Sequence, residues 1–173
     1  MAEPSIEDLK RQYRRLSLAE EDLQEARAFA LAILELDLHS RPKEPLDTEL
    51  RALSLAAVVS YGRAFVKTES SEESPATEFV PKSVRRCLSA EEKDLHQKLL
   101  RLRHEELAHS DLRRLGLQIE LVDGGDISMF WVTRVPLSKR EVQRLKGMTE
   151  KLIDELLRRF EILRSKLPPR LEI

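Results

Sequence analysis

The chain has 173 residues, enough for one domain with a moderate hydrophobic core. Charged residues make up 35% of it, but 30 Lys and Arg nearly balance 31 Asp and Glu, which leaves a formal charge of −1. This balance excludes a surface that is basic over its whole length, so any contact with nucleic acid has to come from a local patch.

The cellular setting is also limited by composition. Cys87 is the only cysteine, which excludes an intrachain disulfide and favours a reducing compartment. Residues 1–30 are rich in charge, and the sequence contains no run of twenty apolar residues. We therefore expect a soluble, cytoplasmic protein without a membrane segment.

Serine followed three residues later by an acidic residue marks the expected helix starts, because each side chain can bond a backbone N–H of the first turn. Such pairs are Ser5 with Asp8, Ser17 with Glu20, Ser89 with Glu92 and Ser138 with Glu141. Asp47 is a further candidate cap. Apolar residues then recur every three or four positions, which predicts helices over 6–16, 23–36, 50–65, 95–107 and 142–163.

Two stretches interrupt the helical pattern. Residues 68–81 are rich in Ser, Glu and Pro, which predicts a mobile loop. Between 117 and 135 the apolar period changes to two, around the turn sequence Asp123-Gly124-Gly125-Asp126, which predicts a β-hairpin. We expect an all-α protein, a four- to five-helix up-and-down bundle with a small inserted β-hairpin near residues 117–135.

The segment most indicative of chemistry is 100–111, which contains Arg103, His104 and His109. An arginine can hold a phosphate, and a histidine can transfer protons near neutral pH; metal-free RNA cleavage needs both. A structural alternative remains open. Arginine and histidine near the end of a helix often only bond the last carbonyls and complement the helix dipole.

A metal site is disfavoured by the spacing of the same histidines. A zinc-protease helix needs two histidines four positions apart on one face. His104 and His109 are five positions apart, which on an α-helix separates them by about 140°. No cysteine or clear third ligand lies nearby, so we predict no metal.

The segment Arg103-His-Glu-Glu-Leu-Ala-His-Ser-Asp111 resembles the signature of the HEPN family (higher eukaryotes and prokaryotes nucleotide-binding domains). That signature is an arginine, a polar residue and, after a short spacer, a histidine; Arg103, His104 and His109 match it. The amino-acid sequence of this segment is also similar to that of abortive-infection-type HEPN proteins of bacteria. The resemblance covers about Ser17 to Leu167 and implies one HEPN-like helical domain over 1–173, although the 117–135 hairpin is not part of the family's common core.

The resemblance implies a metal-independent endoribonuclease without a cofactor, acting as a homodimer whose two motifs meet. Arg103 would hold the scissile phosphate, His109 would act as general acid or base, and His104 would orient the arginine or contact RNA. A toxin or phage-defence protein restrained by an antitoxin protein would fit this description. Two alternatives stay open: a catalytically silent HEPN-like module that binds nucleotides or proteins, and an all-α interaction protein with an accidental motif.

Three further residues are candidate supports for the motif. His96 lies seven positions before Arg103 and so on the same helix face; it lines the same groove or, as we favour, packs in the interior. Tyr61 and Arg63 flank Gly62 in the middle of a predicted helix. A glycine there costs about 1 kcal/mol relative to alanine, which indicates close packing or a nearby ligand.

Basic residues gather on both sides of the motif and form the candidate RNA-binding patch. They are Lys82, Arg85, Arg86, Arg101, Arg113 and Arg114. The equally weighted alternative is a solvated face in which these cations pair with Glu91, Glu92 and Glu105.

Overall fold

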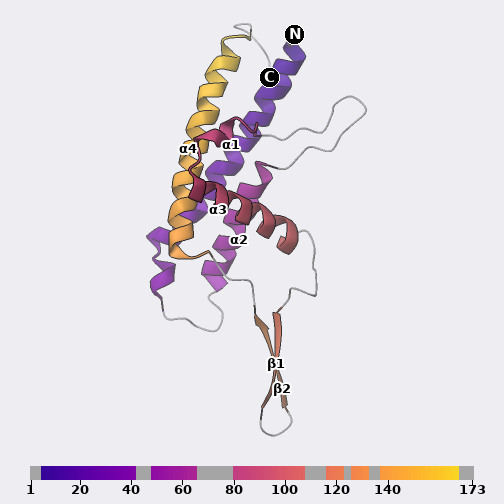
Figure 1. The fold of residues 1–173 in the computed structure, drawn as a ribbon, viewed down its shortest axis with the longest axis vertical. Coiled ribbons are helices and arrows are strands. Elements are labelled where there is room, and N and C mark those ends of the chain that lie inside the picture. The colour runs from indigo at the N-terminus through magenta and orange to yellow at the C-terminus, as the bar shows by residue number, and fades with distance from the viewer. Residues whose placement is uncertain are drawn as a thin grey trace, which may run out of the picture.

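The computed structural model describes residues 5–41, 48–65, 80–107, 116–122, 126–132 and 137–167, and over these the chain is predominantly helical (Figure 1). The helices are α1 (Ile6–Glu35), α2 (Thr48–Arg63), α3 (Ala90–Arg101) and α4 (Lys139–Arg164). Short 3₁₀ turns form η1 (Leu38–Ser40) and η2 (Val84–Cys87), and a π-helical turn, η3 (Leu102–Leu107), follows α3. The strands are β1 (Gly116–Val122) and β2 (Asp126–Val132).

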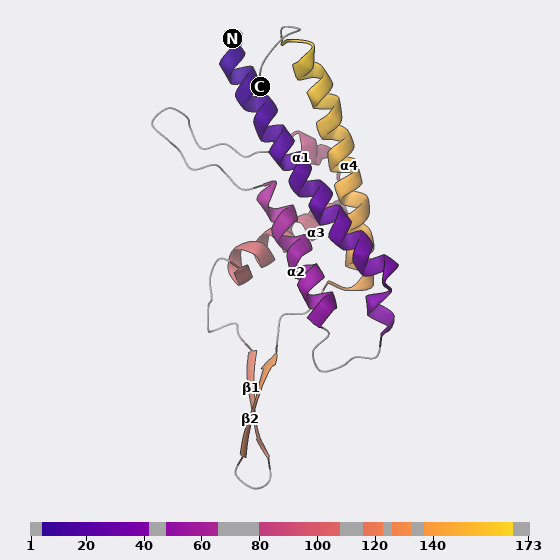
Figure 2. The same ribbon diagram turned by 180° about the vertical axis from the view of Figure 1, so that it is seen from behind.

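The two longest helices, α1 and α4, run antiparallel side by side and form the spine of the molecule (Figures 1 and 2). Ala26 and Ala30 of α1 are fully buried, as are Leu152 and Leu156 of α4. The buried apolar residues of both helices belong to one core cluster and form an apolar seam between them.

Helix α1 is continuous, whereas the sequence predicted two helices over 6–16 and 23–36 with a start at Ser17. That start is wrong. Leu16, Ala19 and Leu23 are all buried, so the apolar stripe continues through the expected break. No glycine or proline interrupts residues 6–35, and the helix hydrogen bonds therefore propagate past Ser17.

The three other predicted capping pairs are confirmed. Ser5, Ser89 and Ser138 each accept a hydrogen bond from the backbone N–H three residues later, and the acidic residue there bonds back to the serine N–H. Asp47, the fifth candidate, lies outside the described residues.

The capping carboxylates of α3 and α4 also tie the two helices together. Glu92, in the cap of α3, accepts a hydrogen bond from Lys151 of α4 at 2.7 Å. Glu141, in the cap of α4, accepts one from Lys98 of α3 at 2.5 Å. Burial raises the pKa of each carboxyl, but the lysine and the serine N–H more than offset this, and both pKa values are lowered.

Helix α3 runs across the α1–α4 pair and not along it (Figures 1 and 2). The helices are therefore not all aligned as the expected up-and-down bundle would have them. Only a short stripe of α3 is buried, namely Glu92, Leu95, His96 and Leu99. A crossing helix of twelve residues meets its neighbours over a short length, which is why this stripe is short.

Strands β1 and β2 pair antiparallel in a continuous register that sets Leu117 opposite Trp131 and Leu121 opposite Ile127. Both strands lie beyond the helices, at the end of the molecule opposite to the start of α1 (Figure 2). Most of the predicted mobile loop, residues 68–79 of 68–81, lies outside the described residues. No described helix is both long and apolar enough to cross a membrane.

The α1–α4 seam can be tested with two adjacent leucines of α4. Leu156 is fully buried, and Leu157 is 48% exposed. We expect Leu156→Ala to lower the free energy of unfolding by about 2–5 kcal/mol, because it leaves a cavity. Leu157→Ala should stay within about 0.5 kcal/mol of wild type. Urea denaturation followed by circular dichroism measures both, and equal losses would contradict this packing.

Candidate functional site

A buried hydrogen-bonded network lies beside the motif and joins four elements. Tyr61 of α2 and His96 of α3 bond through Oη and Nδ1 at 2.7 Å. Arg85 of η2 lies with Nη1 3.4 Å from His96 Nε2, and Tyr61 Oη donates to Met148 Sδ of α4 at 3.6 Å. Tyr61 and His96 are 0% and 2% exposed, so these bonds replace water entirely.

The partners of His96 determine which ring nitrogen carries its proton. A guanidinium can only donate, so Nε2 accepts from Arg85 and the proton lies on Nδ1. Nδ1–H then donates to Tyr61 Oη, whose own hydrogen is directed at Met148. Each donor in the chain meets one acceptor, and the imidazole is neutral.

The environment of His96 keeps it neutral over the physiological range. Burial lowers the pKa of His96, and the positive charge of Arg85 lowers it further, to about 4. The rings of Phe65 and Tyr61 pack against the imidazole edge to face, with centroids 4.7 and 5.8 Å away. Burial likewise raises the pKa of Tyr61 well above its usual value. The favoured interpretation of His96 as an interior packing residue is confirmed.

Arg103 lies in η3 with its aliphatic stem against the backbone of α2. A Cβ atom added to Gly62 would lie 2.7 Å from Arg103 Cγ and 3.1 Å from both Cβ and Cδ. Real Cβ atoms do not come as close as 2.7 Å to another heavy atom. The glycine therefore lets the two segments approach, and the close packing predicted at this position is observed.

The backbone changes from α-helix to π-helix directly before the motif arginine. Helix α3 ends at Arg101, and η3 covers Leu102–Leu107. A π-helical turn is rare and wider than an α-helical one, and such turns are frequent at functional sites. Angles calculated for an ideal α-helix therefore do not apply after Arg101. Nothing in the sequence signalled this change.

The other candidate residues are dispersed. His104 is exposed beside Arg103 in η3, and Arg101 is exposed at the end of α3. Arg63 bonds to Asp22 at 2.7 Å and to Glu25, both of α1, so its side chain points away from the motif. Tyr61, two residues earlier, bonds instead to His96 of α3. His109, Arg113 and Arg114 lie outside the described residues.

Two of the three acids in the alternative pairing, Glu91 and Glu92, have partners outside the basic patch. Glu91 pairs with Arg144 and Glu92 with Lys151, both on α4. Two patch residues, Arg86 and Arg101, are exposed and form no ion pair with any described residue. The side chain of Glu105 is not described.

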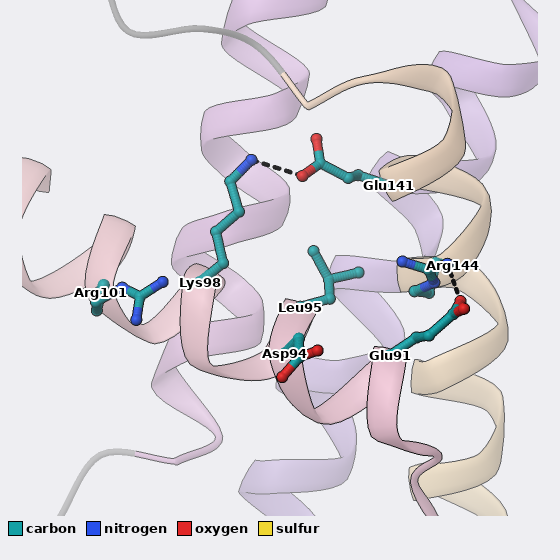
Figure 3. Close-up of a pocket in the computed structure, with 7 residues that line it drawn as sticks. All are labelled: Glu91, Asp94, Leu95, Lys98, Arg101, Glu141 and Arg144. Atoms are coloured by element: carbon teal, nitrogen blue, oxygen red, sulfur yellow. Dashed lines mark hydrogen bonds and ion pairs between the residues drawn. The ribbon is translucent and has the colours of Figure 1, made fainter.

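A groove of about 300 Å³ lies between α3 and the first turns of α4 (Figure 3). Its lining residues are Glu91, Asp94, Leu95, Lys98, Arg101, Glu141 and Arg144. Figure 3 shows Lys98 reaching Glu141 and Arg144 reaching Glu91 across it. Three acidic and three basic side chains balance one another, so the groove offers no excess positive charge to a phosphate.

Among the residues that the structure describes, no three His, Cys, Asp or Glu side chains group as a metal site requires. Comparison of the chain with protein-family models, with curated proteins and with solved structures found no match. A functional proposal therefore depends on the residues and their geometry.

The pKa of His96 predicts a pH-dependent stability. In the unfolded chain its pKa is near 6.5, and in the folded protein it is about 4. Between these values the unfolded state binds a proton that the folded state does not, so stability falls as the pH falls through this window. We expect a loss of roughly 2 kcal/mol between pH 7 and pH 5.

His96→Asn is the matched variant, because its side chain can still bond Tyr61 but does not titrate. Its free energy of unfolding should be lower than wild type at pH 7 and should change less between pH 7 and pH 5. Urea titrations at both pH values measure this. An equal change in the free energy of unfolding between pH 7 and pH 5 for the two proteins would contradict a lowered pKa of His96 in the folded protein.

Proposed function

We propose that the chain is a HEPN-like protein and a metal-independent endoribonuclease of the toxin or phage-defence type, which works as a homodimer. The observation that carries the proposal is the placement of Arg103. This arginine lies on a π-helical turn, half-buried, with its stem against the only glycine of α2. A cation at such a fixed position suits a phosphate of a bound RNA better than a cation on a free surface side chain does.

The proposed reaction needs no metal. The ribose 2′-hydroxyl attacks the adjacent phosphorus, the P–O5′ bond breaks, and the products are a 2′,3′-cyclic phosphate and a 5′-hydroxyl. His109 takes the 2′-hydroxyl proton or gives one to the departing 5′-oxygen, and the corresponding residue of the second copy performs the other transfer. Arg103 stabilises the charge that develops on the phosphate oxygens, and His104 beside it orients the arginine or contacts RNA.

The state of His96 narrows the choice of proton-transfer group. Both of its ring nitrogens have partners, and its pKa of about 4 leaves it neutral at physiological pH. A general acid works best with a pKa near the operating pH. His96 therefore supports the site as a packing residue, and the proposal assigns proton transfer to the histidines of the motif.

The RNA strand would lie over the basic residues near the motif. Arg86 and Arg101 are exposed and are not neutralised by described acids, whereas Glu91 and Glu92 pair with α4. With Arg85, Arg113 and Arg114 they would supply a local positive patch on a chain of nearly zero net charge. Binding through few phosphates predicts a modest dependence on salt.

The test is cleavage of total tRNA and mRNA by the purified protein in EDTA. Arg103→Ala should lower the rate about 10²–10³-fold, as removal of one charge-stabilising donor does. His109→Ala should lower it about 10²–10⁴-fold. Arg158→Ala is the control, since this arginine of α4 is 72% exposed and should leave cleavage unchanged.

Products with 2′,3′-cyclic phosphate ends, lost in both motif variants, would establish the activity. Absence of cleavage by a folded dimer would contradict the ribonuclease and favour the catalytically silent module, which binds a nucleotide or a protein without turnover.

A further inference from the structure

Two unusual features of the backbone meet at the same side chain. Gly62 is a buried glycine one residue before the end of α2, and η3 is a π-helical turn. A π-helical turn is rare, and glycine has a low helix propensity. The stem of Arg103 lies between them. The other helix glycine, Gly147 of α4, has no atom within 4 Å of an added Cβ, so close contact is not a general property of glycines in this fold.

We propose that Gly62 is a positioning residue for Arg103: the absence of a Cβ at position 62 sets where the arginine stem lies and hence where its guanidinium is held. This inference rests on the proposed function of Arg103. The atoms that a Cβ would meet are Cβ, Cγ and Cδ, the part of the side chain closest to the backbone. Rotation of the distant guanidinium cannot relieve that contact, so the stem or η3 has to move.

Helix α2 is unable to turn away because both neighbours of Gly62 are anchored. Tyr61 bonds to His96 of α3 on one side, and Arg63 bonds to Asp22 and Glu25 of α1 on the other. These bonds fix the rotation of α2 about its axis. Any displacement caused by a side chain at position 62 therefore falls on Arg103.

The first experiment compares Gly62→Ala with Gly147→Ala for RNA cleavage, with rates expressed per folded molecule. A displacement of the guanidinium by about 1 Å should lower kcat about 10²-fold with little change in KM, because a misplaced group loses contacts made in the transition state. Gly147→Ala should cleave as wild type does. In an Arg103→Ala background, Gly62→Ala should cause no further loss. Wild-type kcat per folded molecule in Gly62→Ala would overturn the inference.

The second experiment needs no activity. The melting temperature is measured for Gly62→Ala in the wild-type and in the Arg103→Ala backgrounds. We expect Gly62→Ala to lower the melting temperature by roughly 2–4 °C when Arg103 is present. In the Arg103→Ala background, which lacks Cγ and Cδ, Gly62→Ala should leave the melting temperature unchanged or raise it. The same shift in both backgrounds would show that Gly62 does not contact Arg103 and would overturn the inference.

The two experiments also separate the inference from the proposed function. If wild type fails to cleave RNA and the melting temperatures are coupled, the ribonuclease is wrong and the placement of Arg103 by Gly62 stands. If wild type cleaves and the Gly62→Ala effects are absent, the ribonuclease stands and the positioning role is wrong.

Discussion

The hydrogen bond between Tyr61 and His96 is the contact on which the placement of α3 depends. Helix α3 crosses its neighbours and buries only four residues, so apolar packing alone fixes its position less firmly than it fixes α1 against α4. The buried bond adds a directional constraint, and the partners Arg85 and Met148 extend it to η2 and α4. Shifting α3 by one residue would leave several buried polar groups without partners, which is costly in a dry interior.

Ion-paired hydrogen bonds at the surface also connect α3 to α4, as the Tyr61–His96 network does in the interior. The capping glutamates Glu92 and Glu141 each cap the start of one helix and bind a lysine of the other. The cap of α3 is therefore held against α4, and the cap of α4 against α3. These bonds hold the start of α3 against α4, and His96 holds its middle, so both add to the apolar packing that orients α3.

The proposed reaction uses cationic side chains that these contacts between α3 and α4 do not neutralise. Glu91 and Glu92 of α3 are bound to cations of α4, while Arg86 and Arg101 remain exposed without a described acidic partner. His96 is kept neutral by burial and by Arg85, so it can be a rigid support without competing for protons. Arg103 lies at the junction, its stem against Gly62 and its charge on a widened turn.

The sequence by itself determined the features that depend on neighbouring residues. Ser5, Ser89 and Ser138 start helices because a cap needs only a side chain and the next three N–H groups, and the apolar stripes identify the buried faces. The sequence also indicated that Gly62 is closely packed, but it could not name Arg103 as the contact. The continuity of α1 follows from the apolar stripe that runs past Ser17, which outweighs the capping pattern there. The crossing of α3 and the anchoring of Arg63 on α1 were decided by tertiary structure. Both depend on atoms far apart in the chain, and local periodicity carries no information about them.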